Sequence, residues 1–115
     1  MTADDRRAIL VTGCSSGIGL DAARTLAARG WRVFAACRKA EDVARLAGEG
    51  LESLRLDYED PATIAEAAGA ALERSGGRLD ALFNNGAYAI PGFLEDMPVA
   101  AMRAIFEANL FGWHD

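Results

Sequence analysis

Three glycines follow a short apolar stretch near the start of the sequence, at a spacing that could bind phosphate. Residues 9–12 are apolar up to Thr12, the glycines then follow as Gly-x-x-x-Gly-x-Gly, and a helical pattern begins among them. Such glycines permit a tight turn, a close approach of backbone to a pyrophosphate, and packing of helix on strand. A helix N-terminus adds free N–H groups and a partial positive charge. We therefore expect a dinucleotide and nicotinamide chemistry, although an ordinary turn rich in glycine and serine is the alternative. The candidate phosphate-binding residues are Gly13, Ser15, Ser16, Gly17, Ile18 and Gly19.

Cys37, Arg38 and Lys39 follow the second apolar stretch and bear on the choice of cofactor. A site for NAD places a carboxylate here to accept hydrogen bonds from the adenosine ribose, whereas a site for NADP needs a cation for the 2′-phosphate. Cys37 is uncharged, and Arg38 carries a planar guanidinium that suits a phosphate. We therefore predict NADP, with NAD as the alternative. Arg38 and Lys39 could also be a solvated pair in front of a helix.

Asn109 places an amide on the apolar face of a helix. It follows Ile105 by four positions and Phe106 by three, which is the spacing of side chains on one helix face. Asparagine is a poor helix former, and a buried amide needs partners. We expect Asn109 to hold a water molecule or a main-chain group that matters to the site. The alternative is that Asn109 is a core amide whose hydrogen bonds are all made, or that the apolar face of the helix is not the one assumed here.

Two sequence elements resemble a known family. The run Thr12-Gly13-Cys14-Ser15-Ser16-Gly17-Ile18-Gly19 is similar to the Thr-Gly-x-x-x-Gly-x-Gly signature of the short-chain dehydrogenase/reductase family. The run Asn84-Asn85-Gly86-Ala87 resembles that family's Asn-Asn-Ala-Gly element with its last two residues exchanged. Asn109 falls where the family carries an active-site asparagine, which implies a place in a proton-relay water chain. The resemblance covers nearly all of this chain but only the front half of a family member.

The resemblance implies cofactor contacts at the ends of the third and fourth apolar stretches. Asp57 would accept a hydrogen bond from the adenine amino group, with the backbone of Tyr58 nearby, although a carboxylate entering a helix would look the same. Asn84 and Asn85 would support the strand end and the cofactor, or bind neighbouring loop backbone. The exchange to Gly86-Ala87 moves the residue without a side chain by one position, where the family's loop approaches the nicotinamide ribose.

The catalytic residues of the family cannot be assigned in this sequence. Its hydride transfer uses a tyrosine, a lysine four residues later and a serine. Tyr58 is followed four residues on by Ala62, and Tyr88 by Gly92. His114, near the end of the chain, is expected to be exposed or frayed. We therefore expect these 115 residues to be inactive alone and the catalytic serine, tyrosine and lysine to lie outside them.

The elements that must position these residues alternate along the chain, which predicts an α/β fold with a parallel sheet and crossover helices. The expected strands are residues 8–12, 31–36, 53–56 and 79–83. The first two helices are expected at 17–29, stopped by Gly30, and at 40–47, stopped by Gly48. The third has Asp60 as its cap and Pro61 at its first position, and a last helix runs from Asp96 or Pro98 to the chain end. The buried stripes are expected to be Ile64, Ala68, Ala71 and Leu72, and then Met102, Ile105, Phe106, Asn109 and Trp113.

The order of the strands brings the candidate residues together. Right-handed crossovers place the first strand centrally and give the order 3-2-1-4 in a Rossmann-like, doubly wound sheet. Ligands of such sheets bind beyond the carboxyl ends of the strands, at the reversal of strand order. Gly13, Arg38, Asp57 and Asn84 each follow one of those ends, so four loops should converge on one site. The alternative to a shared site is that these polar residues are present only because loops after strands are generally polar.

Composition bounds the remaining possibilities. The 115 residues are 51% apolar and 25% charged, which fits one small globular domain. The net charge of −5 and a pI of about 4.8 disfavour nucleic acid and anionic membranes as partners. Cys14 and Cys37 are too few for a disulfide framework or zinc site, and no leader or long apolar run precedes the first strand. We expect no metal and a reducing, cytoplasmic setting.

Together, these patterns predict that residues 1–115 are the NADP(H)-binding front portion of a single domain of an oxidoreductase. The resemblance implies hydride transfer between the nicotinamide and a small-molecule carbonyl or secondary alcohol, and a homo-oligomer when the protein is intact. Residues 12–19 and 36–39 also resemble the family branch that handles retinoids, steroids and aliphatic aldehydes. The alternative is a non-enzymatic dinucleotide-binding or sensor module, or an inactive remnant.

Overall fold

A four-stranded parallel sheet forms the centre of the computed structural model, which describes residues 4–115. The strands are β1 (Ala8–Val11), β2 (Arg32–Cys37), β3 (Glu52–Arg55) and β4 (Ala81–Phe83). Their order is β3-β2-β1-β4, and Val11 at the end of β1 aligns with Ala35 of β2 and Phe83 of β4. The predicted fold class and strand order are confirmed.

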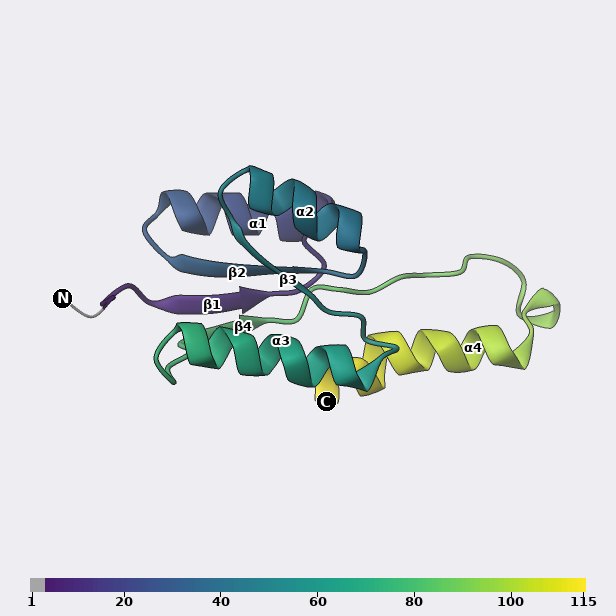
Figure 1. The fold of residues 1–115 in the computed structure, drawn as a ribbon. Helices are drawn as coiled ribbons and strands as arrows, with labels where there is room; N and C mark the ends of the chain where they lie inside the picture. Colours follow the sequence, from purple (N-terminus) through teal and green to yellow (C-terminus); the bar gives the residue numbers. More distant parts are fainter. Residues whose placement is uncertain (1–3) are drawn as a thin grey trace.

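Helices cover both faces of the sheet (Figure 1). Helices α1 (Gly17–Ala28) and α2 (Ala40–Gly48) lie on one face, and α3 (Pro61–Arg74) lies on the other. The chain after β4 extends away from the sheet and returns as the C-terminal helix, giving a longest dimension of 60 Å. That last part consists of a 3-10 turn η1 (Leu94–Asp96), α4 (Val99–Phe106), a π-helical turn η2 (Glu107–Phe111) and α5 (Gly112–His114).

The core has two halves because side chains of a strand alternate between the faces of its sheet. Leu10 and Phe34 pack towards α3, and Val11 and Ala35 pack towards α1 and α2. All four residues of β1 are buried. A strand covered on both faces is apolar along its whole length, which is why the sequence shows a continuous apolar run there.

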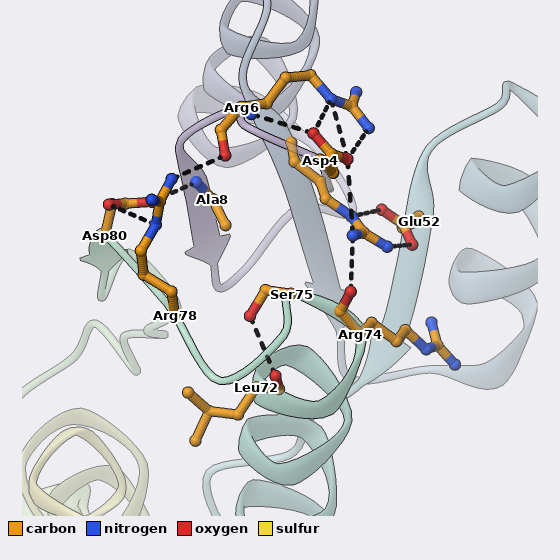
Figure 2. Close-up of polar contacts among 10 residues, drawn as sticks. Asp4, Arg6, Ala8, Glu52, Leu72, Arg74, Ser75, Arg78 and Asp80 are labelled. Carbon is orange, nitrogen blue, oxygen red and sulfur yellow. Dashed lines mark hydrogen bonds and ion pairs between the residues drawn. The ribbon is translucent and has the colours of Figure 1, made fainter. Parts of the chain in front are cut away.

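Ion pairs and hydrogen bonds connect the strands at their amino ends (Figure 2). The glycine loop lies at the other end of the sheet, after the carboxyl end of β1. Arg32 donates to both carboxylate oxygens of Glu52, across 2.9 and 3.0 Å, and to the carbonyl oxygen of Arg74 across 2.6 Å. The carboxylate of Asp80 accepts the backbone N–H of Ala8 across 2.8 Å. These contacts connect β1, β2, β3 and the end of α3, so they stabilise the sheet that positions the site.

The buried face of α3 differs from the prediction. Leu72 is 42% exposed and Ala68 is only half-buried. Small side chains let α3 lie close to the sheet, so its contact face is narrower than the apolar pattern suggests. Asp60 occupies the N-cap position, but its side chain makes no cap hydrogen bond; the hydroxyl of Thr63 bonds to loop backbone instead. The buried residues of α3 are Thr63, Ile64, Ala67 and Ala71.

The predicted stripe of the last helix is also wrong in part. Phe106 and Trp113 are exposed, whereas Ala108 and Gly112 are buried. The π-helical turn takes more residues per turn than an α-helix, so it shifts the buried face of the residues after it, including Trp113; Phe106 lies before the turn, at the end of α4. Other element bounds differ from the prediction by one or two residues, and Gly50, rather than Gly48, adopts the left-handed conformation after α2.

Candidate functional site

A pocket of about 210 Å³ lies where the loops after β1, β2, β3 and β4 meet. The predicted convergence of four loops at the carboxyl ends of the strands therefore produces a cavity that a ligand can enter. The predicted residues that line it are Gly13, Ser15, Arg38, Asp57, Tyr58, Gly86 and Ala87. Leu56, Glu59, Tyr88 and Ala108 complete its wall and were not predicted. The predicted site residues that do not line it are Ser16, Gly17, Ile18, Gly19, Cys37, Lys39, Asn84, Asn85 and Asn109.

The glycine loop has the conformation that its spacing predicts. Gly13 and Gly17 have φ angles of +66° and +60°, a region that side chains disfavour. A β-carbon at Gly17 would meet no atom within 4 Å, so the space above it is open. Helix α1 starts at Gly17, and neither a side-chain cap at Ser16 nor an acidic residue in its first turn competes for its N–H groups. The loop therefore presents an open, electropositive helix N-terminus.

Gly19 and Asn85 fix the position of the glycine loop through contacts with the backbone of Thr12 and Gly13. A β-carbon at Gly19 would fall on the carbonyl group of Gly13, so only glycine lets α1 lie this close to the turn. The side-chain amide of Asn85 donates to the carbonyl oxygens of Thr12 and Gly13 across 3.2 and 3.3 Å. Of the two roles open to Asn85 from the sequence, the structure shows the contact with neighbouring backbone. Arg45 of α2 also binds the loop, through the carbonyl oxygen of Ser15 at 2.6 Å.

Thr12 and Tyr58 join the ends of β1, β3 and β4. The Thr12 hydroxyl oxygen accepts the backbone N–H groups of Asn85 and Gly86, across 2.9 and 3.0 Å, and bonds to the Tyr58 hydroxyl. Tyr58 in turn donates to the side-chain oxygen of Asn84 across 2.8 Å. Burial raises the pKa of the Tyr58 phenol, so it stays neutral and acts here as a hydrogen-bonding group. The sequence analysis gave Tyr58 only a backbone contact.

The residues at the end of β2 differ in exposure: Cys37, the last residue of the strand, is buried, and Arg38 and Lys39 are exposed. Cys37 is 1% exposed and packs on the face of the sheet covered by α1 and α2, so its side chain does not reach the pocket. Burial raises the pKa of its thiol, and it raises that of Cys14 to about 12. Arg38 is exposed and lines the pocket, whereas Lys39 lies at the N-cap of α2 outside it. Of these three side chains, Arg38 alone lines the pocket.

The loop after β3 brings two carboxylates to the pocket. Asp57 accepts the backbone N–H of Glu59 across 3.0 Å, and Glu59 accepts the phenol of Tyr88 across 3.0 Å. Desolvation and this hydrogen bond raise the pKa of Tyr88. The Glu59–Tyr88 contact joins loops that are distant in the sequence. Its only sequence signal is a tyrosine shortly after Asn84-Asn85, in a loop without periodicity.

Asn109 lies in the π-helical turn and is partly buried. Its side-chain oxygen accepts the backbone N–H of Tyr88 across 3.1 Å, and its side-chain nitrogen donates to the carbonyl oxygen of Tyr88 across 2.7 Å. The main-chain partner that the sequence analysis anticipated is therefore Tyr88. Each end of the amide therefore makes one hydrogen bond to Tyr88 and retains capacity for one more.

Within residues 4–115, no helix is both long and apolar enough to cross a membrane. The same part of the chain holds no group of three or more His, Cys, Asp or Glu side chains placed to bind a metal ion.

Comparison with known sequences gives relatives along nearly all of this chain. Residues 7–114 match the family model described as short chain dehydrogenase. The uncharacterized oxidoreductase YbbO of Escherichia coli strain K12 is 37% identical over 109 residues, covering 95% of this chain and 40% of that protein. Human retinol dehydrogenase 8 is 35% identical over 112 residues, covering 92% of this chain and 36% of that protein. The chain thus spans about 40% of the length of these relatives.

Solved structures with the same fold include proteins crystallised with nicotinamide cofactors. A variant of the actinorhodin polyketide ketoreductase with NADPH has a TM-score of 0.88 at 32% identity, covering 99% of this chain and 46% of that one. A short chain dehydrogenase/reductase from Burkholderia phymatum in complex with NAD has a TM-score of 0.85 at 29% identity, covering 99% and 42%.

Proposed function

Because the chain belongs to the short chain dehydrogenase family, we propose that its pocket binds NADP(H) and serves an oxidoreductase acting on a carbonyl compound or secondary alcohol. The observation that carries this proposal is that Arg38 lines the same pocket as Gly13 and Ser15 of the glycine loop. One wall thus offers backbone N–H groups for a pyrophosphate, and the other offers a guanidinium for a further phosphate. Relatives named oxidoreductase and retinol dehydrogenase support the reaction class.

The glycine loop fits the phosphates of a dinucleotide. The open space above Gly17 leaves room for a pyrophosphate against the start of α1. A side chain in this space would exclude the ligand, and the left-handed φ of Gly17 disfavours one. The partial positive charge of the helix terminus would stabilise the anion without a basic residue in the loop.

The residues at the end of β2 favour NADP over NAD. Of the eleven residues that line it, Arg38 alone is cationic. Asp57 and Glu59 also line it. One carboxylate oxygen of Glu59 already accepts a hydrogen bond from the neutral Tyr88 hydroxyl. No carboxylate takes the place of Cys37 at the end of β2, where NAD sites carry one. A 2′-phosphate would therefore find a guanidinium beside it and no acidic competitor at that position.

Asp57 suits the adenine end of the cofactor. Its Oδ1 atom accepts the N–H of Glu59, which fixes the carboxylate, and Oδ2 has no hydrogen-bond partner among the described residues. An adenine amino group could donate to this oxygen. Leu56, Ala87 and Ala108 line the same pocket and provide apolar contacts for a planar base.

The bound nicotinamide would supply or accept the hydride, and the residues described above would bind and orient it. The substrate would be a small carbonyl compound or alcohol. We also propose a homo-oligomer, supported by the exposed apolar side chains of Phe106, Leu110 and Phe111 on the C-terminal helical segment. The cytoplasmic location remains a prediction from composition and cysteine content.

Binding and turnover measurements test the proposed function. NADPH and NADH are titrated into the protein, and oxidation of NADPH is then followed with a panel of aldehydes and ketones. We expect binding of NADPH, more weakly of NADH, and oxidation by at least one carbonyl compound when the full catalytic set is present. Binding without turnover by the complete protein would favour the non-enzymatic module, and binding of neither dinucleotide would refute the proposal.

A further inference from the structure

Tyr58 lies where three segments distant in the sequence meet, beside the proposed cofactor pocket. It follows β3, yet its side chain contacts the loops after β1 and β4 and the start of α5. The residue lines the pocket but is only 8% exposed. Its ring therefore serves mainly as a packing surface for these segments.

The ring of Tyr58 occupies space that two glycines leave free. A β-carbon at Gly86 would lie 2.7 Å from Cε2 of Tyr58. One at Gly112 would fall on Cβ of Tyr58 and lie 2.7 Å from Cγ and Cδ1. Such distances are shorter than real side chains permit, so one group would have to move. Neither glycine is among those with a positive φ angle. Glycine is thus required at Gly86 by the Tyr58 ring, at Gly112 by the Tyr58 side chain as a whole, and at neither by backbone conformation.

The hydroxyl of Tyr58 fixes the same loop by hydrogen bonds. Tyr58 has one hydrogen to donate, and it goes to the side-chain oxygen of Asn84. The hydroxyl oxygen of Thr12 accepts two backbone N–H groups, from Asn85 and Gly86. Its own hydrogen can donate to the Tyr58 hydroxyl, which lies nearer than the carbonyl oxygen of Phe83 at 3.4 Å. The chain of hydroxyls from Thr12 through Tyr58 to Asn84 is therefore fully satisfied.

The position of Gly86 controls the width of the pocket. Its Cα atom lies 2.7 Å from where a β-carbon of Gly13 would be, so the loops after β1 and β4 are in direct contact. The carbonyl oxygen of Gly86 accepts the indole N–H of Trp113 across 2.7 Å. Gly13, Tyr58 and Gly86 all line the pocket. A displacement of Gly86 would therefore move one wall of the cavity relative to the glycine loop.

From these contacts we infer that Tyr58 is a positioning residue of the dinucleotide pocket, because its ring and hydroxyl set where the Gly86-Ala87 backbone lies relative to the glycine loop. This inference rests on the proposed function. It also explains the exchanged order Gly86-Ala87: an alanine in the first of these positions would collide with the Tyr58 ring.

A double-mutant cycle between positions 58 and 86 tests the inference, with the dissociation constant of NADPH and the melting temperature as readouts. Gly86→Ala alone should weaken NADPH binding about tenfold, because the added carbon pushes the loop off the ring. In a Tyr58→Val background the same change should weaken binding by less than about twofold, since the ring is gone. Gly69→Ala is the matched control. Gly69 lies in α3, its β-carbon would meet nothing, and its change should leave NADPH binding unaltered.

If the wild-type protein binds NADPH but Gly86→Ala weakens NADPH binding equally in the wild-type and Tyr58→Val backgrounds, the inference about Tyr58 is wrong and the proposed function stands. A wild-type protein that binds neither NADPH nor NADH would overturn the proposed function, and this inference with it. A purely structural role would shift the melting temperature of Tyr58→Val without coupling the NADPH dissociation constant to residue 86.

A second variant keeps the test decisive if Tyr58→Val does not fold. Tyr58→Phe keeps the ring and removes the hydroxyl, so Asn84 loses its donor and Thr12 loses its bond to the phenol. Because the Thr12 hydroxyl can donate to the carbonyl oxygen of Phe83 instead, we expect NADPH binding about fivefold weaker, the net loss typical of one hydrogen bond. Adding Gly86→Ala to Tyr58→Phe should still weaken binding about tenfold, because the ring remains. NADPH binding by Tyr58→Phe equal to that of the wild type, together with a harmless Gly86→Ala, would contradict the inference.

Discussion

The side-chain amide of Asn109 makes both of its hydrogen bonds to the backbone of one residue, Tyr88, at 3.1 and 2.7 Å. This pairing joins the π-helical turn near the end of the chain to the loop after β4. It also places Tyr88 so that its phenol reaches Glu59 on the opposite side of the pocket. Asn109 thus shapes the pocket without lining it.

We expect Asn109→Ala to lower the free energy of unfolding by about 1–3 kcal/mol, because the N–H and carbonyl groups of Tyr88 lose their partners. Urea unfolding of the two proteins measures the difference. Arg103→Ala, an exposed position of α4, is the control and should change the free energy by less than about 0.5 kcal/mol. Equal stabilities of Asn109→Ala and the wild type would show that water replaces the amide without cost.

Gly19→Val should abolish binding of NADPH and also lower stability, because its β-carbon would fall on the carbonyl group of Gly13. Gly69→Val makes the same change in α3, where the added carbon meets nothing, and should keep NADPH binding. Calorimetric titration of both variants gives the answer. Normal binding by Gly19→Val would mean that the loop is only a turn.

The Arg32–Glu52 pair predicts a pH dependence of stability. The hydrogen bonds from Arg32 lower the pKa of Glu52 in the folded protein. A carboxyl group with a depressed folded-state pKa contributes stability at pH values above its unfolded-state pKa, and loses it as the pH falls through the folded-state pKa. Glu52 is partly exposed, so the contribution is modest.

We therefore expect Glu52→Gln to lower the free energy of unfolding at about pH 7, and the gap from the wild type to shrink towards about pH 3. Urea unfolding at a series of pH values checks this. A gap that stays constant over the whole range would assign the loss to packing and not to the ion pair.

The 115-residue polypeptide, expressed alone, should self-associate and show no NADPH oxidation with aldehydes or ketones. Among residues 4–115, strand β4 pairs only with β1, and its Leu82 and Phe83 are exposed. An open apolar edge favours pairing with another chain. Phe93 and Leu94 are exposed as well, at 76% and 72%. Sedimentation velocity and a turnover assay test this prediction, and a monomer with measurable turnover would show that unrecognised catalytic groups lie within these residues.

Local patterns in the sequence were sufficient to predict most of the fold. The apolar run before Gly13 and the spacing of the glycines lie within one short stretch of sequence, so β1, the turn and α1 could be predicted together. Right-handed crossover connections then gave the strand order. Arg38 and Asp57 could be placed at the pocket because each lies within two residues of the carboxyl end of a strand.

The remaining features depend on contacts between distant segments, which no local pattern records. Tyr58 acquires its role from Thr12, Gly86 and Gly112, which lie far from it in the sequence. Regular helical spacing predicted a buried Trp113, and it failed because the π-helical turn before this residue interrupts the spacing. Cys37 was placed at the cofactor from its position after a strand, although the alternation of side chains turns it into the core.

The central claim is that Arg38 makes this pocket a site for NADP(H), and competing titrations of NADPH and NADH into the wild type and Arg38→Asp test it most directly. One charge-assisted contact predicts that the wild type prefers NADPH by about 1.5–3 kcal/mol. Arg38→Asp should reverse the order. Arg24→Gln, which removes an exposed arginine paired with Glu49 away from the pocket, should keep the wild-type preference. Tighter binding of NADH than NADPH by the wild type would contradict the claim.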